Sequence, residues 1–151
     1  CTWADRFSEG VINRVARFSN GFLPVDTPVW GYKQAQLKVA QQAENYGKDP
    51  TSIEWANFMW ICLGDNAENA RRKAAHVLGH RIGRTEVEFG KSTAFGTPQN
   101  CIDAIEEYIN LGVTHFVLDG VCLPSEMAQQ YEQIASEILP HFNAGLNMSR
   151  F

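Results

Sequence analysis

Long apolar runs and glycine-rich phosphate loops are both missing from this 151-residue sequence. Its longest apolar stretch, from Phe58 to Leu63, is far shorter than the roughly 20 residues that cross a bilayer, so we expect no membrane association. Neither G-x-G-x-x-G nor G-x-x-x-x-G-K-S/T occurs. The sequence therefore lacks both phosphate-binding loops of the doubly wound nucleotide folds.

An excess of basic charge is also missing. The chain holds 13 Lys and Arg residues against 17 Asp and Glu residues, which gives a formal net charge of -4 at pH 7. Nothing in this balance would neutralise a run of phosphates, so nucleic acid is excluded as a partner. With 44% hydrophobic and 11% aromatic residues, the composition is typical of one soluble globular domain.

Cysteines are few, and none belongs to a C-x-x-C pair or to a metal-ligand spacing. Cys62 falls in an expected strand and Cys101 in the first turns of an expected helix, so both are predicted to be buried free thiols. Cys122 falls in an expected loop with no base near it in sequence, which disfavours a nucleophilic role. This usage fits a reducing cytoplasm, where we expect the protein. Because the sequence begins with Cys1 and not with Met, we expect a fragment rather than a lipid-anchored mature protein.

Apolar residues recur at two kinds of spacing, and these alternate along the chain. Spacings of three and four residues predict helices over 8–18, 32–46, 65–77, 97–112 and 127–139. Short apolar runs predict strands over 21–25, 53–63 and 115–118. Residues 85–94 show no period and are expected to form a loop, and the tail 141–151 is expected to be mobile. The alternation predicts one α/β domain over 1–140, with a parallel sheet and helices outside it.

Several residues mark where these helices begin and end. Thr97 is a suitable N-cap for a helix that starts with proline, and Gly112 sits where a left-handed residue would end that helix. Asp65 and Glu68 resemble a capping box for the third helix. Gly10 weakens the first helix by about 1 kcal/mol relative to alanine.

Three segments together resemble the luciferase-like flavin-dependent monooxygenases and oxidoreductases. The first, RVARFSNGFLP at 14–24, is similar to that family's R-x-A-R-x-x-D-G-W-x-P segment, with Asn20 in place of the acid and Phe22 in place of the tryptophan. The second is GKDP at 47–50, followed by an apolar strand and GDN at 64–66. The third runs from FGTP at 95–98 through the strand at 115–118 to ILP at 138–140. Together, in this order, they span nearly the whole chain.

The resemblance implies the C-terminal half of a (β/α)₈ barrel, whose sixth, seventh and eighth strands are the three predicted here. In that family a reduced flavin such as FMN, or a deazaflavin, passes a hydride or activates oxygen toward a small organic substrate. A whole barrel of this type takes roughly 250 residues. We therefore expect this chain to supply a pocket wall and the closing strands, and to be incomplete for catalysis alone.

In such barrels the chemistry lies at the carboxyl ends of the strands. This position gives the candidates that would line a cofactor or substrate, with no general base among them: Pro24, Trp60, Arg81, Arg84, Asp119 and Cys122.

Several of these candidates also have a plainer interpretation. Asp119 precedes a glycine and suits an ordinary turn, and Asp65 suits a helix cap better than a catalytic acid. Trp60 suits core packing as well as stacking on a flavin or substrate ring. Arg81 and Arg84 suit the anionic tail of a cofactor or substrate, or else a solvated helix end.

Three histidines are more typical of structural positions than of a site. His76 and His80, four residues apart on one helix, favour a solvated face over a zinc site because no third ligand is evident. His115 begins the last predicted strand, at the end away from the expected chemistry.

A second interpretation of the whole chain is a non-catalytic half-barrel module. An open parallel sheet leaves strand edges and an apolar inner face uncovered, and such surfaces invite association. We expect either a homo-oligomer or pairing with a separate, complementary N-terminal half-barrel.

Overall fold

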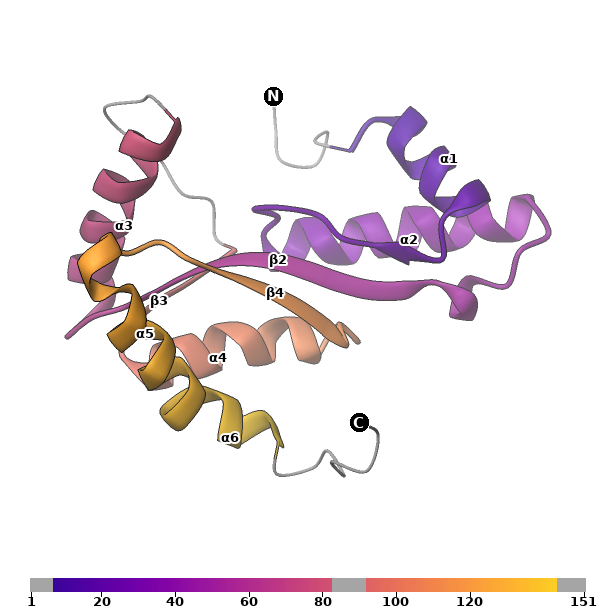
Figure 1. The fold of residues 1–151 in the computed structure, drawn as a ribbon. Coiled ribbons are helices and arrows are strands. Elements are labelled where there is room, and N and C mark those ends of the chain that lie inside the picture. The colour runs from indigo at the N-terminus through magenta and orange to yellow at the C-terminus, as the bar shows by residue number, and fades with distance from the viewer. Residues whose placement is uncertain (1–6, 83–91, 144–151) are drawn as a thin grey trace. The chain divides into compact units, whose positions relative to one another are not determined.

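The computed structural model describes residues 7–82 and 92–143. Helices and parallel strands alternate as expected (Figure 1), with one strand, between the third and fourth helices, that the sequence did not predict. The helices are α1 (Glu9–Phe18), α2 (Val29–Asn45), α3 (Ala67–Ile82), α4 (Pro98–Ile109), α5 (Met127–Gln133) and α6 (Leu139–Asn143). The strands are β1 (Gly21–Phe22), β2 (Glu54–Leu63), β3 (Thr93–Gly96) and β4 (His115–Gly120). Within the described ranges, no helix is both long and apolar enough to cross a membrane.

The chain divides into two compact units. Unit 1 is Cys1–Met59, Gly90–Ser92 and Glu107–Val117, and unit 2 is Trp60–Phe89, Thr93–Glu106 and Leu118–Phe151. Strands β2 and β4 and helix α4 each begin in one unit and end in the other.

β2 is the strand with which the other three pair. β1 lies parallel to its first residues in unit 1, and β3 lies parallel to its last residues in unit 2. The N–H of Glu54 donates to Asn20 before β1, whereas the carbonyl of Trp55 accepts from Thr114 before β4. The backbone N–H and carbonyl of one strand residue point to one edge, and those of the next residue point to the opposite edge. β1 and β4 therefore pair with opposite edges of β2 in unit 1.

The core of unit 1 lies between α1, α2 and one face of β1 and β2. Its buried apolar members are Ile12, Ala16, Phe22, Ala35, Val39, Ala43 and Ile53. Of the apolar residues predicted for α2, Tyr32, Ala35, Val39 and Ala43 are buried, whereas Tyr46 is 46% exposed. The stripe predicted for α1, Val11, Val15 and Phe18, is correct only in part. Val11 and Val15 are half-buried and pack against this cluster, whereas Phe18 is 71% exposed and the buried residues of α1 are Ile12 and Ala16.

Two tyrosines of unit 1 fasten α2 to strand β2 and the end of α4 to the segment between β1 and α2. The hydroxyl of Tyr32 donates to the carbonyl of Ala56 at 2.8 Å, and that of Tyr108 donates to Thr27 at 2.7 Å. Their rings pack edge to face, 5.7 Å apart. Burial raises the pKa of Tyr108 to about 12, so both hydroxyls stay protonated donors at neutral pH.

The core of unit 2 is a second apolar cluster, between α3 and the last residues of β2. Its buried members are Cys62, Ala70, Ala74, Leu78, Phe95 and Val121. The strand β3 contributes Phe95, although the sequence predicted a loop as far as residue 94. All four β3 residues are buried, and so short a segment shows no readable alternation. The rest of that predicted loop, residues 85–91, lies outside the described residues.

The start and the end of α4 follow the predicted chemistry, whereas the start of α3 does not. The N–H of Asn100 donates to Thr97 Oγ1 at 3.3 Å, and Asn100 Oδ1 accepts from the Thr97 N–H in return. Gly112 has φ +83°, as a left-handed helix end requires. The N-cap of α3, however, is Asn66, whose Oδ1 accepts from the Asn69 N–H at 2.9 Å. The prediction that Asp65 caps this helix is therefore wrong.

The last helical segment does not stop at Pro140. Proline lacks an N–H and its ring crowds the carbonyl four residues back, so a regular helix cannot pass through it. Here the π-helical turn Ile134–Ile138 widens the backbone before the proline, and Leu139 donates to the carbonyl of Ile134. α6 then continues to Asn143, and the predicted tail from 144 onward lies outside the described residues.

Candidate functional site

The candidate site lies in unit 2, where the carboxyl ends of β2, β3 and β4 are followed by α3, α4 and the segment leading to α5. In parallel α/β folds, ligands bind at this edge of the sheet. Four of the predicted residues belong to this unit, namely Trp60, Arg81, Asp119 and Cys122. Pro24 belongs to unit 1, where it is buried and its carbonyl accepts from Phe58. Arg84 lies outside the described residues.

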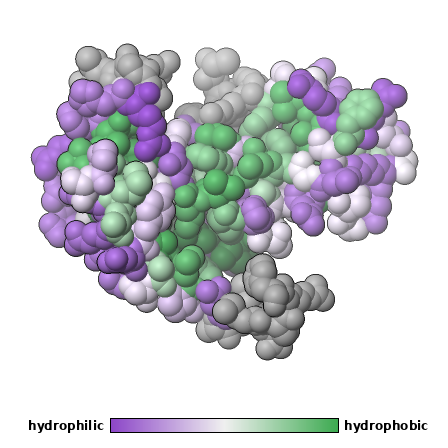
Figure 2. All heavy atoms as spheres, viewed as in Figure 1, coloured by the Kyte–Doolittle hydropathy of each residue, from purple (hydrophilic) through white to green (hydrophobic). Residues whose placement is uncertain are grey.

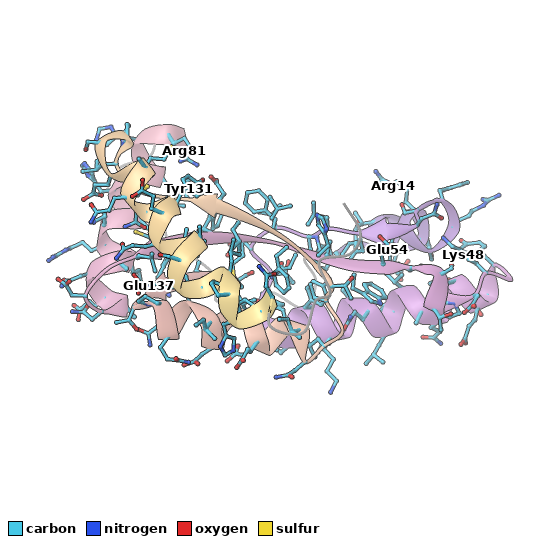
Figure 3. The ribbon with its side chains drawn as sticks, turned by 60° about the horizontal axis from the view of Figure 1, so that its bottom comes forward. Arg14, Lys48, Glu54, Arg81, Tyr131 and Glu137 are labelled. Carbon is cyan, nitrogen blue, oxygen red and sulfur yellow. The ribbon has the colours of Figure 1, made fainter. Side chains whose placement is uncertain are left out.

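Arg81 and Asp119, predicted separately, form an ion pair. Arg81 Nη1 donates to Asp119 Oδ2 at 2.8 Å, and Nη2 donates to the carbonyl of Gly120 at 3.2 Å. The N–H of Gly120 lies 3.3 Å from the hydroxyl of Tyr131, so α3 and α5 both reach the end of β4 (Figure 3). Asp119 lies within β4, not in a turn after it. This ion pair joins α3 to β4. The guanidinium of Arg81, which was predicted to bind an anion, is therefore already bonded within the protein.

Trp60 and Cys122 take up packing positions. Trp60 is half-buried and packs against the cluster that includes Ala74 and Leu78 of α3. Cys122 is fully buried, not an exposed loop thiol.

The three described thiols are all unreactive by their surroundings. Burial raises the pKa of Cys62 to about 11 and that of Cys101 to about 12. Burial, with the Glu126 carboxylate second, also raises the pKa of Cys122. At neutral pH these groups are protonated, and a protonated thiol is a poor nucleophile.

A pocket of about 330 Å³ lies at the carboxyl end of β2. Its walls come from the end of β2, from α3, from the start of α4 and from the segment that ends in α5: Leu63, Gly64, Asp65, Lys73, Pro98, Glu126, Gln129, Gln130 and Gln133. Lys73 Nζ donates to Glu126 Oε1 at 3.0 Å. This hydrogen bond raises the pKa of Lys73, which is therefore charged at neutral pH. Glu126 Oε2 is buried and has no hydrogen-bond partner among the described residues.

Gln130 completes the backbone pairing at the end of β2. Its Oε1 accepts from the N–H of Leu63 at 2.8 Å, and its Nε2 donates to the carbonyl of the same residue at 2.9 Å. The side-chain amide thus satisfies both backbone groups of Leu63, as a neighbouring strand would. It also fixes α5 against the pocket.

Sequence reasoning missed Glu126 and Gln130. The predicted apolar face of the last helix was Met127, Tyr131, Ile134 and Ile138, but Met127 and Tyr131 are 37% and 43% exposed. The buried stripe is Gln130, Ile134 and Ile138, four residues apart. The signal available in the sequence was a glutamine at the same four-residue spacing as two isoleucines, which places all three on one face of the helix.

The described residues offer no metal centre. Within 7–82 and 92–143, no group of three or more His, Cys, Asp or Glu side chains is placed to hold a metal ion. The rings of His76 and His80 lie 4.7 Å apart, and both side chains are exposed on α3.

The fold is that of an open α/β half-barrel, with parallel strands alternating with helices and polar groups gathered at the carboxyl ends. It matches roughly half of the barrel in solved structures of luciferase-like, F420- or FMN-dependent enzymes. The resemblance given by the sequence motifs is therefore confirmed as a likeness of fold.

Three of these structures illustrate the likeness. The coenzyme F420-dependent tetrahydromethanopterin reductase from Methanopyrus kandleri is 18% identical, with a TM-score of 0.65 over 90% of this chain and 49% of its own. An F420-dependent secondary alcohol dehydrogenase, solved with an F420-acetone adduct, is 16% identical, with a TM-score of 0.62 over 85% and 46%. The long-chain alkane monooxygenase LadA is 14% identical, with a TM-score of 0.61 over 91% and 39%.

The chain thus spans less than half the length of the solved structures it matches. No protein-family model matches it, and no curated protein matches it significantly in sequence.

Proposed function

We propose that this chain works as the C-terminal half of a luciferase-like oxidoreductase, one that uses reduced flavin or a deazaflavin on a small organic substrate. The observation that carries the proposal is the shared fold over 85% to 91% of the chain with enzymes named for F420 or for monooxygenation. Its strand ends would form one wall of the substrate pocket. Buried free thiols at Cys62, Cys101 and Cys122 support a reducing cytoplasm as its location.

The described residues do not fit a flavin ring on their own. None of the residues lining the unit 2 pocket is aromatic, and Arg81 is already held by Asp119 and Gly120. Trp60 packs against the α3 cluster. We therefore assign no reaction step to a cofactor on this chain, and we propose that the ring's main contacts come from a complementary half.

A cofactor titration tests this proposal. FMN and F420 would each be titrated with the isolated chain and with a version extended at its N-terminus by the preceding coding segment, followed by cofactor fluorescence. We expect saturable binding by the extended version and none, or much weaker binding, by the isolated chain. Absence of binding by both versions would contradict the proposal.

A second candidate function is a non-catalytic module that pairs through the face of its sheet. In unit 1, Phe22 points into the core with α1 and α2, so alternation puts Leu23 on the opposite face. Leu23 and Val25 are 49% and 42% exposed, and Val25 lies beside Phe58 of β2. Figure 2 shows hydrophobic residues gathered over the strands, on the side away from α2. Light scattering that gives a monomer, with no binding of an apolar dye, would contradict this function.

A further inference from the structure

The polar pocket of unit 2 has unused hydrogen-bonding groups of both kinds. Lys73 gives one of its three ammonium hydrogens to Glu126 and makes no other hydrogen bond to a described residue. Asp65 and Gln129 also line the pocket, are exposed, and make no side-chain hydrogen bond within the described part of the chain. Free donors and free acceptors therefore face one cavity.

The charges of the pocket select against an anion. One ammonium, from Lys73, stands beside two carboxylates, from Asp65 and Glu126, and the lining holds no arginine. A phosphate or carboxylate would meet a net negative charge and would have to compete with Glu126 for the lysine. Apolar and aromatic ligands are disfavoured as well, because amide and charged groups make up most of the wall.

We propose that this pocket binds a small, neutral, polyhydroxylated molecule, a polyol or cyclic polyol. Each ligand hydroxyl can both donate and accept a hydrogen bond. One hydroxyl can therefore accept from Lys73 while its neighbour donates to Asp65, and the amide of Gln129 can take either role. At about 330 Å³ the cavity is at the lower end of the range for ligand pockets and suits a molecule of one ring. Gln130, whose amide is already bonded to both backbone groups of Leu63, holds the wall in place. This inference does not rest on the proposed oxidoreductase function.

The test compares myo-inositol with cyclohexanol, which has the same ring but a single hydroxyl. Each is titrated into the whole chain while the backbone amide signals of Gly64, Asp65 and Gln129 are followed by NMR. We expect myo-inositol to saturate these shifts with a Kd of about 1–10 mM, and cyclohexanol to leave them unchanged. Inorganic phosphate and tetramethylammonium are titrated in the same way.

Variants assign the binding to these side chains. Lys73→Met should weaken myo-inositol binding about tenfold, whereas its control, Lys38→Met in unit 1, should leave the Kd unchanged. Asp65→Asn should weaken myo-inositol binding about threefold, with Glu44→Gln as its control. Because Asp65→Asn keeps the Lys73–Glu126 pair, this variant still tests the proposal if Lys73→Met fails to fold.

Four results would overturn the proposal. They are equal shifts with inositol and cyclohexanol, no saturation by inositol, saturable binding of phosphate or tetramethylammonium in its place, and variants that bind as the unchanged chain does. None of these readouts depends on FMN or F420, so this proposal and the proposed function fail separately.

Discussion

Gln130 is the residue on which the candidate site most depends. Its amide satisfies the N–H and the carbonyl of Leu63 in a buried position. Gln130→Leu leaves the N–H of Leu63 without a partner and its carbonyl with only the weak Cys62 Sγ donor at 3.8 Å, and we expect it to lower the free energy of unfolding by about 2–4 kcal/mol. Gln129→Leu, an exposed neighbour on the same helix, should change it by less than about 0.5 kcal/mol. Urea unfolding followed by circular dichroism measures both, and equal effects would refute the assigned role.

The buried thiols predict how stability depends on alkaline pH. Their pKa values are raised in the folded chain, from 9.0 to about 11 for Cys62 and about 12 for Cys101. Because the folded state favours the protonated thiol, this contribution is complete below pH 9 and is lost as the pH rises toward the folded values. Between these limits each thiol should remove about 1.4 kcal/mol of unfolding free energy per pH unit.

Urea unfolding at a series of pH values checks this slope. A second measurement is the reaction of the thiols with a disulfide reagent at neutral pH, which should be much slower in the folded chain than in urea. Reaction of Cys62, Cys101 and Cys122 at the unfolded rate would contradict the burial on which the prediction rests.

At the scale of single elements, two glycines should respond in opposite directions to alanine. Gly112 ends α4 with φ +83° and has no atom within 4 Å of an added Cβ, so Gly112→Ala costs backbone strain alone. We expect Gly112→Ala to lower the free energy of unfolding by about 1 kcal/mol. Gly10 lies in α1, where an added Cβ would meet only Ser8 Oγ, at an ordinary contact distance of 3.8 Å, so Gly10→Ala should stabilise the chain by about 0.5–1 kcal/mol. Thermal unfolding of both variants tests the pair, and a shift of the same sign in both would be inconsistent with these backbone roles.

Most elements could be predicted from the sequence because their determinants are local. Thr97 caps α4 and Gly112 ends it through contacts within a few residues, and the buried residues of α2 from Tyr32 to Ala43 recur at steps of three and four. The continuation past Pro140 could not be predicted, since it depends on a π-helical turn that the sequence pattern does not mark. The site was only partly predictable for a related reason. Arg81 and Asp119 are 38 residues apart in sequence, and only the fold brings them into contact.

At the scale of the whole molecule, we predict that the exposed apolar residues of unit 1 promote self-association. We expect Leu23→Ser combined with Val25→Ser to lower binding of an apolar dye severalfold and to shift any self-association toward monomer, because both side chains are exposed and apolar and Val25 lies beside Phe58 of β2. Phe18→Ser is the matched control, since Phe18 is 71% exposed on α1 and faces away from its core. Dye fluorescence and light scattering across a concentration series measure both variants. If Phe18→Ser has the larger effect, the association surface is the helical side, and the half-barrel does not pair through its sheet.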